Sequence, residues 1–319
     1  MRYCSPKLLT KKIILVDGIS RAGKLLAGSL ISSFHNSEHL EFGENFEHFC
    51  PALTFNKVDL NYARSYIFNY LNQTIYNKYL SRNVNFRPTD RTGVPNSINL
   101  NNYIKRLKSK EGDEIIKLIK KENKQIPFIT HDLLVNINSL NDLGINYKMI
   151  QIFRNPVDLV MSWFKRGLGN RYGRDQRIFT LMINKNDKVY PWYNEILNFN
   201  KNLNELEKCI NYVYSLTKKS LLNYKKLKKN EKKKVFITSY EKITQDTEVE
   251  IKKISIFLNL KISNHTTKFI NKEKCPKKFD QNKLNRNRLY IKSKVKKIYY
   301  DKLISLEKSF NQNTYNLFN

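Results

Sequence analysis

The stretch KIILVDGISRAGKLL, residues 12–26, decides the fold that we expect for this chain. Its first part, residues 13–17, is a short apolar run of the kind that forms a buried strand. A loop with two glycines follows, and residues 24–34 have the pattern of a helix. Such an arrangement suits a phosphate, because the loop backbone can approach it and the helix N-terminus offers N–H groups and partial positive charge.

The glycine loop is similar to a nucleotide-phosphate loop, but it lacks the magnesium ligand. Gly18, Gly23 and Lys24 have the spacing G-x-x-x-x-G-K, after which nucleotide triphosphatases place a Ser or Thr that holds the metal. Leu25 occupies that position and has no side-chain oxygen. The loop therefore disfavours magnesium-dependent chemistry on ATP, and we expect no metal site.

Further short apolar runs alternate with longer segments of helical periodicity. The predicted strands are residues 127–130, 148–153 and 234–240, and the further predicted helices are residues 60–80, 99–122, 192–227, 246–258 and 293–310. Apolar strands separated by helices are typical of a parallel sheet that is covered on both faces. We therefore expect an α/β fold with three layers, α/β/α, around a central parallel sheet.

The chain carries a large excess of positive charge. It has 58 Lys and Arg against 28 Asp and Glu, which gives a net charge of +30. Such a charge favours anionic partners, including nucleotides, sulfated ligands and nucleic acid. The chain is also rich in the residues that AT-rich codons encode, and its basic residues are spread over its length. We therefore expect no nucleic-acid partner. The alternative from another functional class is a non-enzymatic, basic nucleic-acid-binding protein.

The sequence also bears on the compartment. No apolar run approaches the roughly 20 residues that span a bilayer. Residues 1–12 lack the apolar centre of a secretory signal. The four cysteines are scattered without C-x-x-C spacing, which suggests neither a zinc site nor a disulfide framework. We expect a cytoplasmic protein without a membrane span.

Two distant segments share features with one enzyme family. In FRNPVDLVMS, residues 153–162, Arg154 ends a predicted strand and Ser162 lies two turns into the following helix. In TSYEKI, residues 238–243, Tyr240 ends another predicted strand. Together with the glycine loop, these segments resemble the sulfotransferases that use 3′-phosphoadenosine 5′-phosphosulfate (PAPS). The resemblance implies a P-loop-type fold with a central parallel sheet of about five strands. It also implies metal-free transfer of a sulfuryl group to an acceptor hydroxyl or amine.

The resemblance also implies the organisation of the chain. It runs in chain order over a core of about residues 12–260. The basic helical stretch at about residues 280–319 follows as an extension. We therefore expect residues 1–319 to form a single sulfotransferase-like domain.

By this resemblance, the loop binds the 5′-phosphosulfate, and Arg21 stabilises the charge that develops on the bridging oxygen as the sulfuryl group leaves. Arg154 and Ser162 match the pair that binds the 3′-phosphate, since an Arg fork and a hydroxyl suit phosphate geometry. Tyr240 matches a position near the adenine, or is a core tyrosine that closes its strand. The predicted cofactor-binding residues are Gly18, Ser20, Arg21, Ala22, Gly23, Lys24, Leu25, Leu26, Arg154, Ser162 and Tyr240.

The loop departs from the family pattern at Ala22, Lys24 and Leu25, around the position of two family hydroxyls. Lys24 adds a cation, and the sequence leaves open whether this cation replaces the lost hydrogen bonds. Leu26 stands where cytosolic members have an aromatic residue on the adenine, so the adenine must pack differently here. The altered loop also leaves open a protein that binds PAPS without turnover.

The general base has two kinds of candidate. In IPFITHDLL, residues 126–134, His131 follows a predicted strand, as the catalytic His does in cytosolic members of the family. Carbohydrate-type members use a Glu soon after the first helix, and residues 37–49 offer Glu41 and Glu44 there. The predicted catalytic residues are His131, Arg21, Lys24, Glu41 and Glu44, with His131 preferred as the base.

The acceptor is less well specified than the donor. Residues 83–93 and 165–177 are candidate acceptor loops, and the arginines of the second suit an anionic acceptor such as an acidic sugar. We expect a glycan or small-molecule acceptor. A small-molecule or nucleotide kinase that uses the same loop is the rival enzyme.

Overall fold

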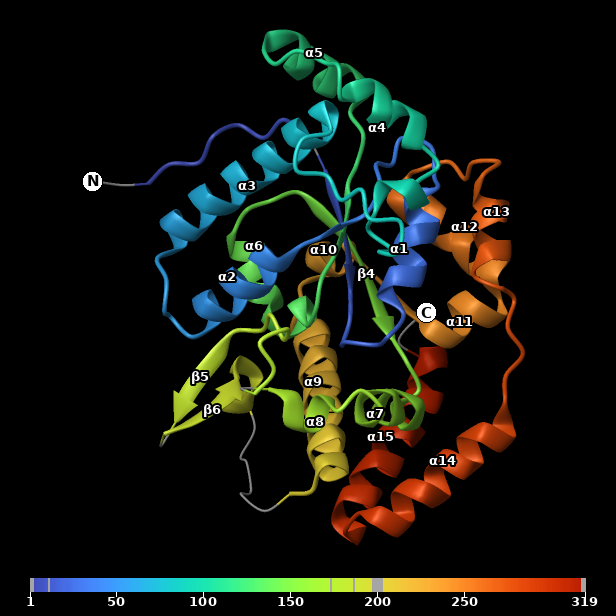
Figure 1. The fold of residues 1–319 in the computed structure, drawn as a ribbon. Helices are drawn as coiled ribbons and strands as arrows, with labels where there is room; N and C mark the ends of the chain where they lie inside the picture. Colours follow the sequence, from blue (N-terminus) through green and yellow to red (C-terminus); the bar gives the residue numbers. More distant parts are fainter. Residues whose placement is uncertain (1–2, 11, 173, 186, 197–202, 317–319) are drawn as a thin grey trace.

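The computed structural model describes residues 3–10, 12–172, 174–185, 187–196 and 203–316. Five strands form one parallel sheet in the order β2-β3-β1-β4-β7 (Figure 1). They are β1 (Ile13–Asp17), β2 (Glu41–Phe42), β3 (Pro127–Ile129), β4 (Tyr147–Phe153) and β7 (Val235–Ser239). The predicted α/β fold with a central parallel sheet of five strands is confirmed.

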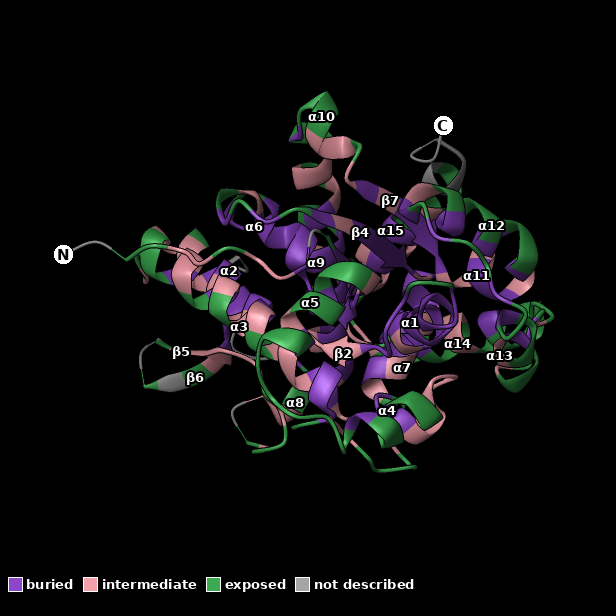
Figure 2. Ribbon diagram, turned by 90° about the horizontal axis from the view of Figure 1, so that it is seen from above, coloured by how far each residue is buried: buried purple, intermediate pink, exposed green. Residues whose placement is uncertain are grey.

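Strand β1 lies at the centre of the sheet and is buried on both faces. Ile13 and Leu15 point into a core formed with α2 (Glu44–Thr54), α3 (Leu60–Leu80), α5 (Asp113–Glu122) and α6 (Ile137–Asp142). Ile14 and Val16 point to the opposite face, which α1 (Lys24–Ser32), α11 (Tyr240–Gln245), α12 (Thr247–Leu258) and α13 (Thr266–Lys272) cover (Figure 2). Since side chains alternate along a strand, an all-apolar strand requires such a cover on both faces.

A third apolar cluster lies beyond the end of the sheet. It joins α7 (Pro156–Phe164) and α9 (Glu205–Lys226) to the C-terminal helices α14 (Gln281–Lys294) and α15 (Lys297–Asn316). Leu303 of α15 is 1% exposed within it. This packing ties the basic C-terminal helices to the core and supports the proposal that the chain is one domain.

Most predicted elements are confirmed, but three predicted helices are divided differently in the structure. The helix predicted at residues 99–122 is two helices, α4 (Leu100–Arg106) and α5, because a polar stretch ending at Gly112, with φ 124°, interrupts it. The helix predicted at residues 293–310 corresponds to α15, which begins only after the extended Val295.

The long helix predicted at residues 192–227 starts later than expected. Trp192–Ile196 form a 3-10 helix, and residues 197–202 of this prediction lie outside the described residues. Helix α9 begins at Glu205, where Asn204 and Glu207 form a capping box that satisfies the first N–H groups. The predicted helix started too early because its apolar periodicity continues across Asn204, whereas the capping box fixes the start of the helix there.

The sequence did not predict the shortest elements. Strand β2 has two residues, and the antiparallel pair β5 (Met182–Lys185) and β6 (Lys188–Pro191) projects beside α9 (Figure 1). The other short elements are the helices α8 (Leu168–Arg171) and α10 (Lys229–Lys232) and the 3-10 turns at Val94–Asn96 and Leu133–Asn136.

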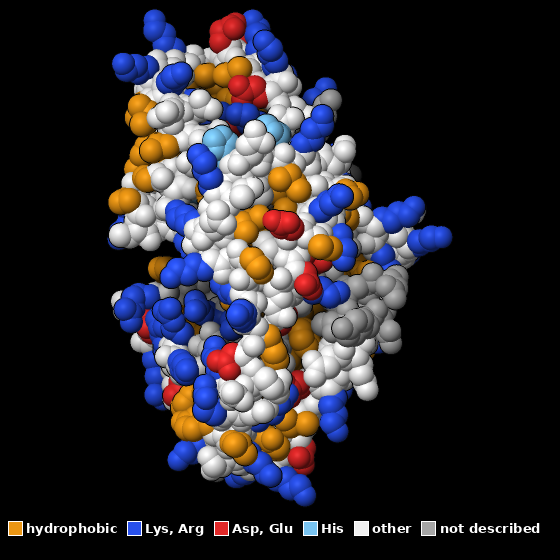
Figure 3. All heavy atoms as spheres, turned by 90° about the vertical axis from the view of Figure 1, so that its right-hand side faces the viewer, with side chains coloured by type: hydrophobic (Ala, Val, Ile, Leu, Met, Phe, Trp, Pro, Cys, Tyr) orange, Lys and Arg blue, Asp and Glu red, His pale blue; other side chains and the backbone are white. Residues whose placement is uncertain are grey.

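The positive charge is distributed over the surface. On the face that carries α12 and α14, Lys and Arg side chains are scattered among acidic and uncharged ones, and they gather beside a hollow at one edge (Figure 3). No helix in the described part of the chain is long and apolar enough to cross a membrane.

Candidate active site

Loops that follow four strands meet at the carboxyl edge of the sheet. The glycine loop follows β1, His131 follows β3, Arg154 follows β4, and Tyr240 follows β7. In open parallel sheets, ligands bind outside this edge. Because β1 lies between β3 and β4, the glycine loop is the neighbour of both the His131 loop and the Arg154 loop.

The two loop glycines occupy positions that a side chain cannot take. A Cβ at Gly18, which has φ 151°, would lie 2.4 Å from the carbonyl oxygen of Ile152 on β4. A Cβ at Gly23, which has φ 105°, would lie 2.5 Å from Cδ2 of Tyr240. The glycines therefore let the loop pass close to the β4 backbone and the Tyr240 ring.

The N-terminus of α1 is open toward this loop. The N–H groups of Ala22 and Leu26 already donate to carbonyl oxygens of the loop, at 3.1 Å each. Helix geometry leaves the N–H groups of Gly23, Lys24 and Leu25 without an intrahelical acceptor, and no side chain caps this end. These three N–H groups are therefore available to a ligand.

Three guanidinium groups lie beside the loop. Nε of Arg21 donates to Oγ of Ser162 at 3.3 Å, and Nη1 of Arg154 donates to the carbonyl oxygen of Arg21 at 3.0 Å. Burial, followed by the charges of Arg166 and Arg154, lowers the pKa of Arg21. Nε of Arg154 is buried without a hydrogen-bond partner, and none of the three arginines forms an ion pair within the described residues. Burial raises the pKa of the nearby Glu241 carboxyl group, although the charge of Arg154 acts in the opposite direction. Three neighbouring arginines that form no ion pair indicate an anion site.

Tyr240 forms one wall of this anion site. The guanidinium carbon of Arg154 lies 4.5 Å from the centre of its ring. Nζ of Lys277 lies 5.7 Å from the same ring centre and 3.5 Å from its hydroxyl. The sequence analysis missed Lys277, because the lysine-rich C-terminal region does not mark one lysine over another.

One arginine of α14 is paired within the protein. Arg288 forms an ion pair with Glu307 of α15 at 2.9 Å and accordingly has a raised pKa. Lys277 is therefore the cation of the C-terminal segment that lies nearest to Tyr240 among those with contacts described here.

Lys24 points into the protein. The residue is 4% exposed, and its ammonium group donates to the carbonyl oxygens of Gly18 and Ile19, at 2.7 and 2.9 Å. Burial lowers its pKa, while the charges of Asp132 and Asp17 act in the opposite direction. In this arrangement, Lys24 holds the loop together and compensates buried carboxylates, and its predicted contact with phosphosulfate stays a prediction.

Asp17 completes this buried network. Its carboxylate accepts hydrogen bonds from Thr130 Oγ1 at 3.0 Å and from the N–H groups of Leu133 and Leu134 at 3.1 Å. It thereby joins the end of β1 to the turn after β3. Since His131 lies within this turn, the network also positions His131 relative to the loop.

We expect Lys24→Met to destabilise the fold. The change removes two hydrogen bonds and leaves Asp17 and Asp132 without their nearby cation, so we expect the free energy of unfolding to fall by about 3 kcal/mol. Urea denaturation measures the change, with Lys120→Met on the exposed surface of α5 as the control. Equal stability of the two variants would contradict this account of Lys24.

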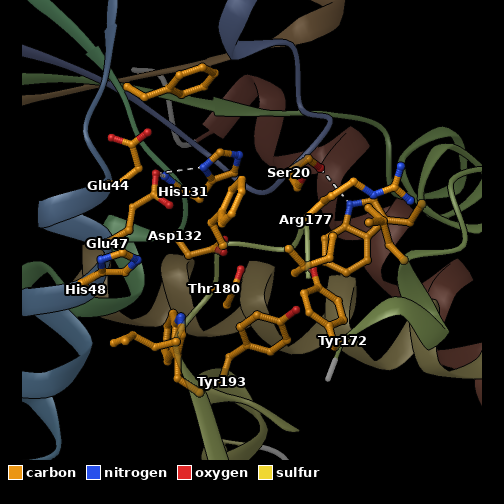
Figure 4. Close-up of a pocket in the computed structure, with 17 residues that line it drawn as sticks. Ser20, Glu44, Glu47, His48, His131, Asp132, Tyr172, Arg177, Thr180 and Tyr193 are labelled. Atoms are coloured by element: carbon orange, nitrogen blue, oxygen red, sulfur yellow. Dashed lines mark hydrogen bonds and ion pairs between the residues drawn. The ribbon is translucent and has the colours of Figure 1, made fainter. Parts of the chain in front are cut away.

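A cavity of about 470 Å³ lies between the glycine loop and the His131 turn. Ser20 of the loop, His131 and Asp132 line it, together with Glu44 and Glu47 of α2 (Figure 4). The rest of the wall is mainly aromatic and aliphatic. The cavity therefore has a polar end at the loop and an apolar body, as small-molecule sites commonly have.

His131 is held by a carboxylate that the sequence analysis missed. Oε1 of Glu47 lies 2.9 Å from Nδ1 of His131 and accepts its backbone N–H at 3.0 Å (Figure 4). A carboxylate at Nδ1 favours the tautomer with hydrogen on Nδ1, which leaves Nε2 free to accept a proton. Glu47 lies three residues after Glu44 and therefore on the same helix face, which was an available signal.

The two glutamates proposed as rival bases differ in position. Oε2 of Glu41, on β2, pairs with Nζ of the buried Lys78 at 2.9 Å, and Glu41 is not among the residues that line the cavity. Glu44 does line the cavity, and burial raises its pKa. Since a carboxylate with a raised pKa is the better base near neutrality, Glu44 is the stronger rival of His131.

The two predicted acceptor loops are not equivalent. None of residues 83–93 lines the cavity. In the second loop, Arg177 lines the cavity, but its guanidinium group pairs with Asp175 at 2.9 Å, and Arg171 pairs with the same carboxylate at 2.7 Å. Part of the positive charge that suggested an anionic acceptor is therefore neutralised within the loop.

Comparison with known proteins identifies a family whose model matches most of this chain. The family model described as a sulfotransferase domain matches residues 92–305, a segment that contains His131, Arg154, Ser162 and Tyr240 and begins after the glycine loop. No curated protein matches this chain.

Several solved structures are similar in fold. The sulfotransferase domain of the Synechococcus PCC 7002 olefin synthase is 11% identical over 98% of this chain and 98% of that chain, with a TM-score of 0.48. The sulfotransferase domain from the curacin biosynthetic pathway is 9% identical over 83% and 77%, with a TM-score of 0.44. Sulfotransferase STF1 of Mycobacterium tuberculosis is 10% identical over 82% and 71%, with a TM-score of 0.41.

Proposed function

Since this chain belongs to the sulfotransferase domain family, we propose that it transfers a sulfuryl group from PAPS to the hydroxyl group of a small acceptor. The observation that carries the choice of donor is the cluster of Arg21, Arg154 and Arg166, none of which forms an ion pair within the described residues. A donor with phosphates at both ends needs such cations together with helix N–H groups, and both occur beside the loop.

Different residues along the carboxyl edge of the sheet bind the two ends of the donor. Arg154 and Ser162 bind the 3′-phosphate, and Tyr240 forms the wall beside it. The free N–H groups at the start of α1 bind the 5′ end of the donor. PAPS, when bound, supplies the sulfuryl group and the leaving group. Arg21 stabilises the negative charge that forms on the bridging oxygen.

The acceptor hydroxyl binds in the cavity next to His131. Its oxygen forms a bond to sulfur as the bond between sulfur and the bridging oxygen breaks, and Nε2 of His131 takes the hydroxyl proton. Glu47 holds the imidazole in the required tautomer and stabilises the cation that results. Atoms and charges balance without a further reactant.

Calorimetry with 3′-phosphoadenosine 5′-phosphate, the desulfated donor, tests the choice of donor against ATP with Mg²⁺. We expect tight binding of the desulfated donor without a metal and weak binding of ATP. The opposite preference would overturn the proposal in favour of a kinase. Transfer of labelled sulfate from PAPS to a panel of phenols and alcohols then tests turnover, and binding without any transfer would indicate a PAPS-binding protein without activity.

A further inference from the structure

The cavity next to His131 is rich in carboxyl groups, although the whole chain is strongly basic. Three carboxylates line it, from Glu44, Glu47 and Asp132, in a protein with a net charge of +30. The cationic side chain among the lining residues is that of Arg177, which is already paired with Asp175. The other titratable groups of the wall are the imidazoles of His48 and His131 and the phenol groups of Tyr172 and Tyr193.

Asp132 is the least satisfied of the three carboxylates. Its side chain belongs to a residue that is 9% exposed, and Oδ1 has no hydrogen-bond partner in the described part of the chain. The nearest compensating cation is Lys24, but the Lys24 ammonium donates to the carbonyl oxygens of Gly18 and Ile19 instead. A buried carboxylate oxygen without a hydrogen-bond donor destabilises the protein. Oδ1 of Asp132 can therefore accept a hydrogen bond from a ligand.

Glu44 is a second carboxyl group whose charged form burial disfavours. It forms no ion pair within the described residues, and burial raises its pKa. Burial, followed by the charge of Asp17, likewise raises the pKa of Asp132 well above its usual value. A bound cation would relieve both groups, because it offsets the burial and the mutual repulsion that disfavour their charged forms. A bound anion would face the same carboxylates and be repelled.

The remaining wall suits an aromatic body and a cation. Six rings line the cavity, those of Phe42, Trp163, Tyr172, Phe179, Trp192 and Tyr193. Tyr172 and Tyr193 lie across the cavity from Glu44 and Glu47 (Figure 4). Ring faces attract both aromatic rings and organic cations. Uncharged rings offer few hydrogen-bond donors for the many hydroxyls of an acidic sugar.

We propose that the acceptor is an aromatic amino alcohol, in which an ammonium group lies a few bonds from the hydroxyl group that receives the sulfuryl group. This inference rests on the proposed sulfuryl transfer. His131 and Asp132 are consecutive and Glu47 contacts His131, so base and carboxylates share one end of the cavity. The hydroxyl and the ammonium group bind at that end, and the aromatic group extends along the ring-lined body. The anionic acceptor suggested by the loop arginines is thereby replaced with a cationic one.

A matched set of three acceptors tests the proposal. Phenylethanolamine carries the ammonium group, a second compound has a methyl group in its place, and a third has a carboxylate there. We expect kcat/KM for the ammonium compound to exceed that for the methyl compound by about 10-fold or more, since a charged hydrogen bond is lost in the latter. The carboxylate compound should be the poorest of the three.

Asp132→Asn and Glu44→Gln should each reduce this ratio between the ammonium and methyl compounds. Loss of a general base would lower kcat/KM for all acceptors alike, so the ratio separates charge recognition from catalysis. Glu248→Gln, on the exposed surface of α12, is the matched control and should keep the ratio. If Asp132→Asn fails to fold, the ratio measured for Glu44→Gln tests the inference instead.

Calorimetric binding of phenylethanolamine to the protein saturated with the desulfated donor provides a readout without turnover. Equal or better use of the methyl or carboxylate compound would overturn this inference while sulfuryl transfer stands. Absence of transfer to every acceptor, together with no binding of the desulfated donor, would overturn the proposed function itself. Absence of transfer with tight donor binding leaves the decision to the calorimetric comparison of the three compounds.

Discussion

His131→Ala is expected to lower kcat by about a hundredfold to ten-thousandfold, the range over which a positioned general base acts. The imidazole lines the cavity and its Nδ1 is held by Glu47, so that its loss removes the proton acceptor without disturbing the anion site. Affinity for the desulfated donor should therefore stay unchanged. Steady-state kinetics and calorimetry on the same preparation measure both quantities.

Two further measurements distinguish a base from a structural histidine. Added imidazole should partly restore the activity of His131→Ala, because it can enter the vacated space and accept the proton. Glu47→Gln should lower kcat by about 10-fold with little change in KM, since the amide no longer fixes the tautomer. Full activity of His131→Ala would sink the assignment, and Glu44→Gln would then be the variant to measure.

Arg154→Ala is expected to weaken binding of the desulfated donor by about 10-fold to 100-fold, as loss of a hydrogen bond between charged groups implies. The guanidinium group stacks on Tyr240, holds the carbonyl oxygen of Arg21, and leaves Nε unpaired in a buried position. Arg154→Lys should recover only part of the affinity, because an ammonium group keeps the charge but not the planar fork.

A variant at a neighbouring arginine serves as the control for Arg154. Arg174→Ala removes an exposed arginine from residues 165–177 and should change affinity little. If Arg154→Ala and Arg174→Ala bind the donor equally well, the affinity comes from general positive charge. The specific anion site described here would then be wrong.

Local patterns predicted most of the regular structure. The strand at residues 13–17 and the helix at residues 60–80 match β1 and α3, because an uninterrupted apolar run and a long periodic segment each favour one conformation strongly. The helix ends were less accurate, since they depend on single residues such as Asn204 at the start of α9 and Gly112 before α5. Strand β2 escaped prediction because two residues carry no periodicity.

The candidate site was predicted only where its residues follow strands. Arg154 and Tyr240 directly follow β4 and β7, and His131 lies two residues after the end of β3. The carboxyl ends of parallel strands meet at one edge of the sheet. Glu47 reaches His131 across 84 positions of the sequence, and Lys277 reaches Tyr240 across 37. Such pairings follow from how α2 and the segment after α13 pack against the rest of the protein, which no local pattern encodes.

The sequence by itself determined the strand, glycine loop and helix of residues 12–26, because backbone freedom at Gly18 and Gly23 and the apolar run before them are local properties. Only the tertiary structure decided which way the charges point. It turned Lys24 inward toward the loop carbonyls and buried Asp132 at the cavity without a partner. The physical reason is that burial and neighbouring charges, which arise from long-range packing, set the role of an ionisable side chain.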